Sequence, residues 1–261
     1  MPRFLVATAL LAVSATAEAK VQTRSVPYKD GAAELEGFLA WDDAGSDKRP
    51  AVLVVHEWWG LNDYAKSRAR QLAEMGYVAF AADMFGKGKV TADPKVAGEW
   101  AGHMKGDVGA WMARARAALD VLRKHDRVDT KRVAAIGYCF GGSTVLGLAF
   151  GGEDLAAVVS FHGGLSVPTP EQAKAVKARM LVCHGADDGF IPADVVSNFR
   201  ATLDTAKAPY QFVAYPGARH GFTNPGADKY GVDGVKYDKS ADEQSWKDMR
   251  ALLDKVFKPA K

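Results

Sequence analysis

The chain has 261 residues, of which 48% are hydrophobic and 25% charged, and its formal net charge at pH 7 is +3. This composition is ordinary for a globular protein and excludes a disordered, collagen-like or disulfide-scaffold chain. So small a charge, without a dense block of lysine and arginine, gives no support to nucleic-acid binding. The two cysteines are too few for a zinc finger or a disulfide framework, although they could form one disulfide or supply one nucleophile.

The N-terminus has the features of a secretory signal peptide. Arg3 gives a positive start, Phe4–Val13 is an uncharged apolar stretch, and residues 17–19 form an A-x-A cleavage pattern. The apolar stretch is too short for a stop-transfer helix, and the alternative is an uncleaved anchor. We expect residues 1–19 to be a signal peptide and residues 20–261 a single domain without stable membrane insertion. The mature protein would then be secreted, most simply to a bacterial periplasm.

Apolar runs of strand length alternate with amphipathic stretches along the rest of the chain. The predicted strands are 35–41, 51–55, 77–82, 132–137, 156–161, 179–184 and 210–215. The predicted helices are 63–75, 107–125, 141–150, 193–206 and 241–257. This alternation predicts an α/β fold with a mostly parallel central sheet and helices on both faces, in which residues 35–41 form an antiparallel strand.

Such a sheet binds ligands at the carboxyl ends of its strands. Three segments, 86–106, 163–177 and 224–239, carry no clear periodicity and are expected to be irregular. We expect all three to lie over or beside that edge, as a lid or pocket wall.

The most informative motif is Gly137-Tyr138-Cys139-Phe140-Gly141, which joins a predicted strand to a predicted helix. It is the G-x-S-x-G nucleophile elbow with cysteine in the serine place, and its glycines relieve a tight turn. At a helix N-terminus the thiolate is favoured, and the Phe140 N–H can stabilise an oxyanion. The alternative is a buried structural cysteine beside a glycine turn. A phosphate-binding loop is disfavoured because no G-K-[ST] follows.

Partners for this nucleophile follow in the chain order acid, then histidine. Asp187 and Asp188 come after one late strand, and either could be the acid; His220 comes after the next strand. Of the other histidines, His103 and His125 are predicted to be solvated, and His162 and His184 to be structural or pocket-lining.

The segment His56-Glu57-Trp58-Trp59-Gly60 follows the strand 51–55. A zincin would need a second histidine where Gly60 stands, on a helix, so we expect no metal site here. Glu57 and the Trp58 backbone are better placed at the carboxyl edge of the sheet.

With these motifs, the chain resembles the dienelactone hydrolase family of α/β-hydrolases over about 24–259. The matching stretches are 56–60, 137–142, 188–192 and 220–222. The resemblance implies an α/β-hydrolase fold. It selects Asp188 as the acid of a triad with Cys139 and His220, and it implies no cofactor.

The resemblance also implies a role for each residue. Glu57 keeps the thiol protonated at rest and takes its proton when substrate binds. Cys139 then forms a thioester, with the Phe140 and Trp58 N–H groups as oxyanion hole. His220, oriented by Asp188, assists the leaving group and later activates water.

The substrate pocket departs from the family's best-known members. Their arginine four residues after the histidine, which binds a substrate carboxylate, is replaced by Asn224, and the predicted lid carries lysines (Lys87, Lys89, Lys95) and no arginine. Lysine is a poorer bidentate partner for a carboxylate. The expected pocket residues are Trp59, Phe85, His162, Phe222 and Asn224.

The sequence thus predicts a monomeric, exported hydrolase of small carboxylic esters or lactones. The alternative is a non-catalytic binding protein or thiol redox protein on the same fold. A Cys139–Cys183 disulfide is not expected, because the strand 156–161 should lie between the two cysteines. Two inter-strand steps of about 4.8 Å exceed the roughly 7 Å limit on Cα separation.

Overall fold

The computed structural model describes residues 20–258. The predicted signal peptide, 1–19, lies outside them. Over 20–258, no helix is long and apolar enough to cross a membrane.

Eight strands form one sheet in the order β1-β2-β4-β3-β5-β6-β7-β8. From β4 to β8 all neighbours are parallel, whereas β2 is antiparallel to both β1 and β4. The strands are β1 (Val21–Asp30), β2 (Ala33–Asp42), β3 (Arg49–Val55), β4 (Val78–Ala82), β5 (Val128–Tyr138), β6 (Ala157–Phe161), β7 (Arg179–Gly185) and β8 (Tyr210–Tyr215). The predicted mostly parallel sheet is confirmed.

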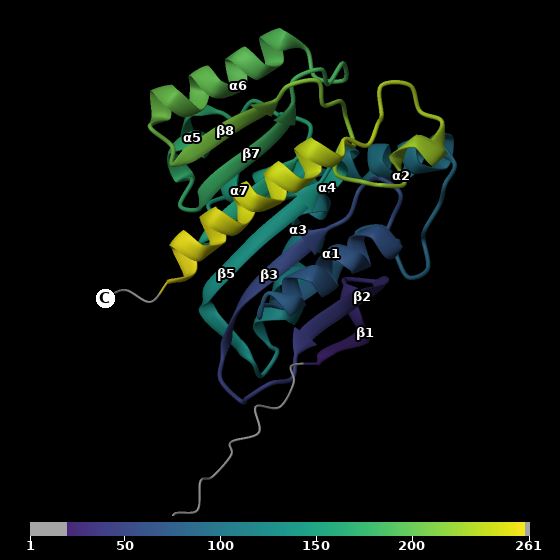
Figure 1. Cartoon of the computed structure of the whole chain (residues 1–261), viewed down its shortest axis with the longest axis vertical. Coiled ribbons are helices and arrows are strands. Elements are labelled where there is room, and N and C mark those ends of the chain that lie inside the picture. Colours follow the sequence, from purple (N-terminus) through teal and green to yellow (C-terminus); the bar gives the residue numbers. More distant parts are fainter. Residues whose placement is uncertain (1–19, 259–261) are drawn as a thin grey trace, which may run out of the picture.

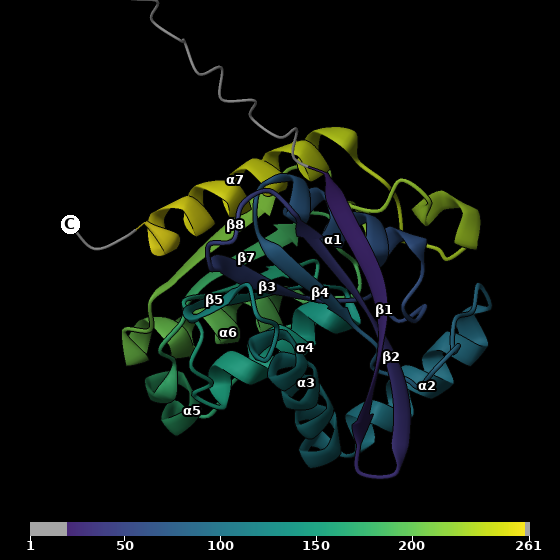
Figure 2. The same ribbon diagram turned by 90° about the horizontal axis from the view of Figure 1, so that it is seen from below.

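Helices cover both faces of this sheet. They are α1 (Asp63–Glu74), α2 (Pro94–Gly106), α3 (Val108–Arg123), α4 (Phe140–Phe150), α5 (Pro170–Ala175), α6 (Ala193–Ala206) and α7 (Lys239–Phe257), with a 3₁₀ turn η1 (Ala227–Tyr230). Helices α1 and α7 pack on one face, and α3, α4, α5 and α6 on the other (Figures 1 and 2).

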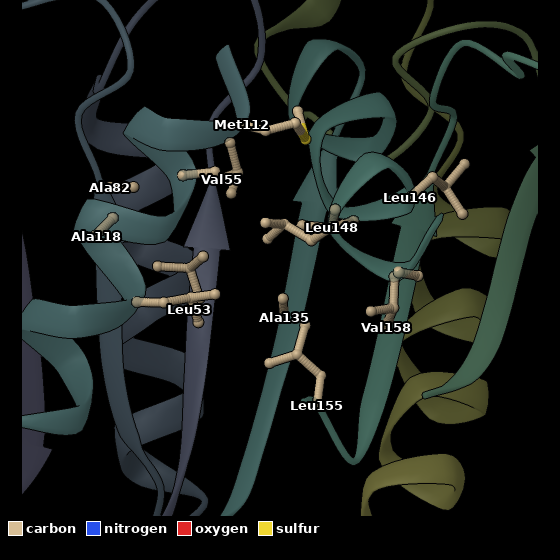
Figure 3. Packing of buried hydrophobic residues seen from close by; sticks show 14 of the residues in the cluster. Leu53, Val55, Ala82, Met112, Ala118, Ala135, Leu146, Leu148, Leu155 and Val158 are labelled. Atoms are coloured by element: carbon tan, nitrogen blue, oxygen red, sulfur yellow. The ribbon is translucent and has the colours of Figure 1, made fainter. Parts of the chain in front are cut away.

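The central strands are apolar on both sides because both faces are covered. In β3, Leu53 and Val55 point into the core beneath α3 and α4, whereas Val52 and Val54 point into the core beneath α1 and α7. Figure 3 shows the first of these cores, in which Leu53 and Val55 pack among side chains that include Met112 of α3. This packing fixes the carboxyl ends of β3, β5, β6 and β7 side by side.

Three elements differ from the sequence prediction. The edge strand β1 was missed, because its exposed polar residues give no clear apolar alternation. Helix α2 lies in the segment predicted to be irregular, and its three glycines (Gly98, Gly102, Gly106) lower helix propensity while its buried residues hold it against the core. Helix α5 also lies in a segment predicted to be irregular, although Thr169 and Gln172 form a capping box at its start.

Candidate active site

Cys139 occupies a strained turn between β5 and α4. Its φ of 52° and ψ of −112° are rare for a residue with a side chain. The flanking glycines are required sterically: a Cβ on Gly137 would lie 2.1 Å from the Gly141 carbonyl oxygen, and one on Gly141 would lie 2.2 Å from that of Val55. The turn is therefore pressed against the end of β3, as the elbow motif predicts.

The residue after Cys139 is the first of α4. Phe140 stands where helix N–H groups have no carbonyl partner within the helix, and the partial charge there is positive. Its ring is buried and stacks on Trp111 with a centroid distance of 5.2 Å. The Phe140 backbone is thus held rigidly beside the half-buried thiol.

Asp188 and His220 form a direct contact at the ends of β7 and β8. Nδ1 of His220 lies 2.8 Å from Oδ2 of Asp188, whose side chain is fully buried. Oδ1 of Asp188 accepts the Phe190 N–H at 3.0 Å. Asp187 is exposed, so of the two candidate acids the one that contacts His220 is Asp188. Because a carboxylate only accepts, Nδ1 carries a proton and Nε2 is left for other partners.

The ring of His220 is held from two sides. The rings of His162 and Phe190 each meet it edge to face, with centroids 5.2 Å away. Burial disfavours its charged form, but the neighbouring Cys139 and Asp188 outweigh burial and raise the pKa of His220 to about 10. His220 can therefore hold a proton next to the thiol at neutral pH.

Glu57 is buried just beyond the end of β3. Its Oε2 accepts a hydrogen bond from Nδ2 of Asn224 at 2.6 Å. Burial raises the pKa of Glu57 to about 7, although the Asn224 bond and the charges of His220 and Arg68 act to lower it. Glu57 can thus gain or lose a proton near neutral pH.

These side chains meet in one cavity of about 250 Å³. Its wall consists of Glu57, Trp58, Trp59, Lys105, Cys139, Phe140, Ser143, Gly164, Phe190, Ile191, His220 and Val235. Each segment expected to form a lid or pocket wall contributes to it: Lys105 lies in the last turn of α2, Gly164 follows β6, and Val235 follows η1. The structure therefore brings together the predicted triad, Glu57, and both residues of the predicted oxyanion hole.

One of the five predicted pocket residues lines the cavity. Trp59 lines the cavity and stacks on Tyr230 of η1 at 3.8 Å between centroids. Phe85, His162, Phe222 and Asn224 do not line it. Phe85 and Phe222 are buried in aromatic clusters behind the wall, against Phe140 and His162 respectively.

His162 and Asn224 contact cavity-lining residues from the side away from the cavity. His162 is fully buried beneath His220, and its Nε2 contacts the Thr223 hydroxyl at 2.7 Å. Burial holds the pKa of His162 well below its ordinary value, so the ring is neutral. Asn224 contacts Glu57 and lies outside the cavity.

Lys105 was not anticipated from the sequence. It is the one lysine or arginine among the described residues that line this cavity. The lysines of the predicted lid do not line this cavity. Lys87 pairs with Glu36, and Lys89 lies over the Trp100 ring. The signal for Lys105 would have been recognition of α2, whose last turn carries it to the cavity.

Both cysteines are free. Strand β6 lies between β5 and β7, as predicted, and separates Cys139 from Cys183. Burial raises the pKa of the Cys183 thiol to about 12, whereas Cys139 lines the cavity. Over residues 20–258, no group of three or more His, Cys, Asp or Glu side chains is arranged to hold a metal ion.

A mostly parallel eight-stranded sheet with a cysteine elbow after β5, an aspartate after β7 and a histidine after β8 defines an α/β-hydrolase. The sequence model of the dienelactone hydrolase family matches residues 35–257, and the chain belongs to this family. It is a hydrolase that acts on ester or lactone bonds. The family predicted from the sequence is confirmed.

Three relatives match this chain over most of both lengths. The solved structure called m3DLH is 42% identical with a TM-score of 0.87, over 91% of this chain and 99% of its own. A dienelactone hydrolase-like promiscuous phosphotriesterase from metagenomic libraries is 40% identical with a TM-score of 0.88, over 90% and 98%. A Saccharolobus solfataricus protein provisionally named carboxymethylenebutenolidase is 24% identical over 90% of this chain and 99% of its own.

Proposed function

We propose that the protein is an exported hydrolase of small carboxylic esters or lactones that works through a thioester on Cys139. The observation that carries this proposal is the shared cavity of Cys139 and His220, with Asp188 bonded to His220 at 2.8 Å. The strained backbone of Cys139 supports a nucleophile, because such conformations cluster at reactive positions.

The reaction begins with transfer of the Cys139 proton to the Glu57 carboxylate. The thiolate then attacks the carbonyl carbon, and the Phe140 and Trp58 N–H groups stabilise the oxyanion. As this intermediate collapses, protonated His220 donates its proton to the departing oxygen and the thioester forms.

Hydrolysis of the thioester reverses these roles. Neutral His220 removes a proton from water, and the resulting hydroxide attacks the thioester carbonyl. Cys139 leaves as the thiolate and recovers its proton from Glu57, while the acid product departs. Asp188 keeps the proton of His220 on Nδ1, so that Nε2 faces the reaction in both halves.

The cavity supports a small substrate. Its volume of about 250 Å³ is below the usual range for drug-sized ligands, roughly 300–1,000 Å³. Most of its wall is apolar, and the charged exceptions are Lys105, Glu57 and protonated His220. A small acyl group or lactone ring fits this lining.

The decisive experiment compares the two cysteines. Cys139→Ala is expected to abolish turnover of p-nitrophenyl acetate with the fold intact by circular dichroism. Cys183→Ala, which removes a buried thiol outside the cavity, is expected to remain active. Rapid quenching followed by mass spectrometry should detect acetylation on Cys139 of the unaltered protein. Undiminished turnover by Cys139→Ala contradicts the proposal. An unaltered protein that neither turns over the ester nor becomes acetylated on Cys139 favours the alternative, a binding or thiol redox protein.

A second activity, hydrolysis of neutral phosphotriesters, is supported by the 40% identity to the promiscuous phosphotriesterase. Here the thiolate would attack phosphorus, expel an alcohol or phenol, and leave a phosphorylated cysteine for water to hydrolyse. Release of p-nitrophenol from paraoxon tests this activity, and its absence from an enzyme active on esters refutes it.

Export rests on the sequence of residues 1–19. The first strand begins at Val21, so cleavage after Ala19 would leave β1 whole. N-terminal sequencing of protein from the periplasmic fraction tests the site: a start at Lys20 supports it, and a start at Met1 or Pro2 contradicts it. Size-exclusion chromatography tests the proposed monomer and limited proteolysis the single domain.

A further inference from the structure

The side-chain amide of Asn224 has a fixed orientation. Its Oδ1 accepts the Gly226 N–H at 2.8 Å, and its Nδ2 lies 2.6 Å from Oε2 of Glu57. A backbone N–H can only donate, so the oxygen must face Gly226 and the NH₂ group must face Glu57. Asn224 therefore offers Glu57 a hydrogen-bond donor and cannot offer an acceptor without losing the turn.

The backbone of Asn224 is equally constrained. Its N–H donates to the Gly221 carbonyl at 3.0 Å, and its carbonyl accepts the Ala227 N–H at 2.9 Å. This turn starts directly after His220, and Asn224 is only 3% exposed. The donor is thus held in place by the segment that carries the histidine.

Several titratable groups surround Glu57. Within the described residues, Glu57 forms no salt bridge with any of them. They are His220, Arg68 and Tyr64 of α1, Tyr230 of η1, and Cys139 and Lys105 of the cavity wall. The neutral amide of Asn224 is the closest polar contact of this buried carboxylate.

We propose that Asn224 is a positioning residue that holds Glu57 as a proton acceptor for Cys139 by donating a neutral hydrogen bond. This inference rests on the proposed function, in which Glu57 takes the thiol proton. A neutral donor stabilises the carboxylate enough for it to form in a buried site. A cation in the same place would stabilise the carboxylate further and make Glu57 a weaker base.

The test uses two substitutions that change the donor in opposite ways. Asn224→Leu removes the donor. The acid limb of the pH profile of kcat/KM, on which activity falls as Glu57 becomes protonated, should then have a midpoint about one pH unit higher. Asn224→Lys supplies a cation, so the midpoint should fall by about one unit or more. Both variants lose the contact to Gly226. A merely structural role would lower activity at every pH and would leave both midpoints unmoved.

The control is Asn62→Leu. Asn62 caps α1, and its Nδ2 contacts the Tyr230 hydroxyl at 3.4 Å, so the same amide is removed near the same loop without touching Glu57. Its midpoint is expected to match that of the unaltered enzyme. A midpoint that moves as far in Asn62→Leu as in Asn224→Leu overturns the proposal.

A second readout does not depend on activity. The ¹³C resonance of the Glu57 carboxyl, assigned by its loss in Glu57→Gln, is titrated in each variant labelled at glutamate. A higher pKa in Asn224→Leu and a lower one in Asn224→Lys support the contact, and an unchanged pKa in both overturns it. If the pKa of the Glu57 carboxyl shifts as expected while the midpoint of the acid limb does not move, the contact between Asn224 and Glu57 is supported. The role of Glu57 as the base in the proposed function then fails.

Discussion

Asp188 holds His220 through a 2.8 Å contact between Oδ2 and Nδ1, while its other oxygen accepts the Phe190 N–H. The aspartate is thereby fixed by the loop after β7, and the orientation of the histidine follows from it. Phe190 also packs against the His220 ring, so one short loop supplies both the acid and one side of the ring's support.

Asp188→Asn tests this contact. The amide preserves shape but does not hold the imidazole in the required tautomer or stabilise its charge, so kcat should fall by about 10³–10⁴-fold. Steady-state kinetics on p-nitrophenyl acetate measure the loss. The matched control is Asp187→Asn at the exposed neighbour, where kcat is expected to stay within about twofold. Equal losses in both variants would contradict the assignment.

The pH dependence of kcat/KM should be bell-shaped. In the proposed mechanism Glu57 must be ionised to take the thiol proton, so activity should fall as pH drops through its pKa of about 7. His220 must be protonated to assist the leaving group, so activity falls again as pH rises through its pKa of about 10. Glu57→Gln should lower kcat by about 10²-fold or more and remove the acid limb. Glu34→Gln, at an exposed carboxylate, should retain the full profile, and an acid limb that survives Glu57→Gln would exclude Glu57 as its source.

The glycines of the elbow are expected to be required for the stability of the fold as well as for activity. Gly137→Ala would place a Cβ 2.1 Å from the Gly141 carbonyl oxygen, and such a clash should cost about 3 kcal/mol or more in the free energy of unfolding. Gly102→Ala is the control, because a Cβ there meets nothing within 4 Å and helix α2 should gain about 0.5–1 kcal/mol. Urea unfolding followed by circular dichroism measures both. A tolerated Gly137→Ala would show that the turn can relax.

Lys105 should affect substrates according to their charge. Lys105→Met is expected to leave kcat/KM unchanged for a neutral ester and to lower it by about fivefold for an ester that carries a carboxylate, since an exposed ion pair contributes at most about 1 kcal/mol. Lys95→Met, on the same helix and outside the cavity, is the control. Equal effects on both substrates would exclude charge recognition by Lys105.

The elbow, His220 and an acid at position 187 or 188 could be predicted because their signals are local in the sequence, whereas the choice of Asp188 came from the family resemblance. Each residue lies at a strand end, and the parallel strands bring such ends to one edge. Helix α2 could not be predicted with the same ease, because its packing overrides the low helix propensity of Gly98, Gly102 and Gly106. Lys105 was missed together with it.

The contact between Asn224 and Glu57 joins residues 167 positions apart, which periodicity and spacing do not report. The aromatic side chains expected in the pocket show the same difficulty. Phe85 follows the carboxyl end of β4 and Phe222 follows His220 in the chain, but their rings turn into the core, where large apolar surface is better buried. Orientation at this level is decided by tertiary packing.

Strand β6 limits the ways in which the sulfur of Cys139 can be oxidised. Because Cys183 lies two strands away from Cys139, the chain has no second thiol with which Cys139 could form an intramolecular disulfide. Cys139 is half-buried in the wall of a cavity of about 250 Å³, a space large enough for a small peroxide. Oxidative damage should therefore begin as a sulfenic acid on one atom, which a small reductant can reach and reverse.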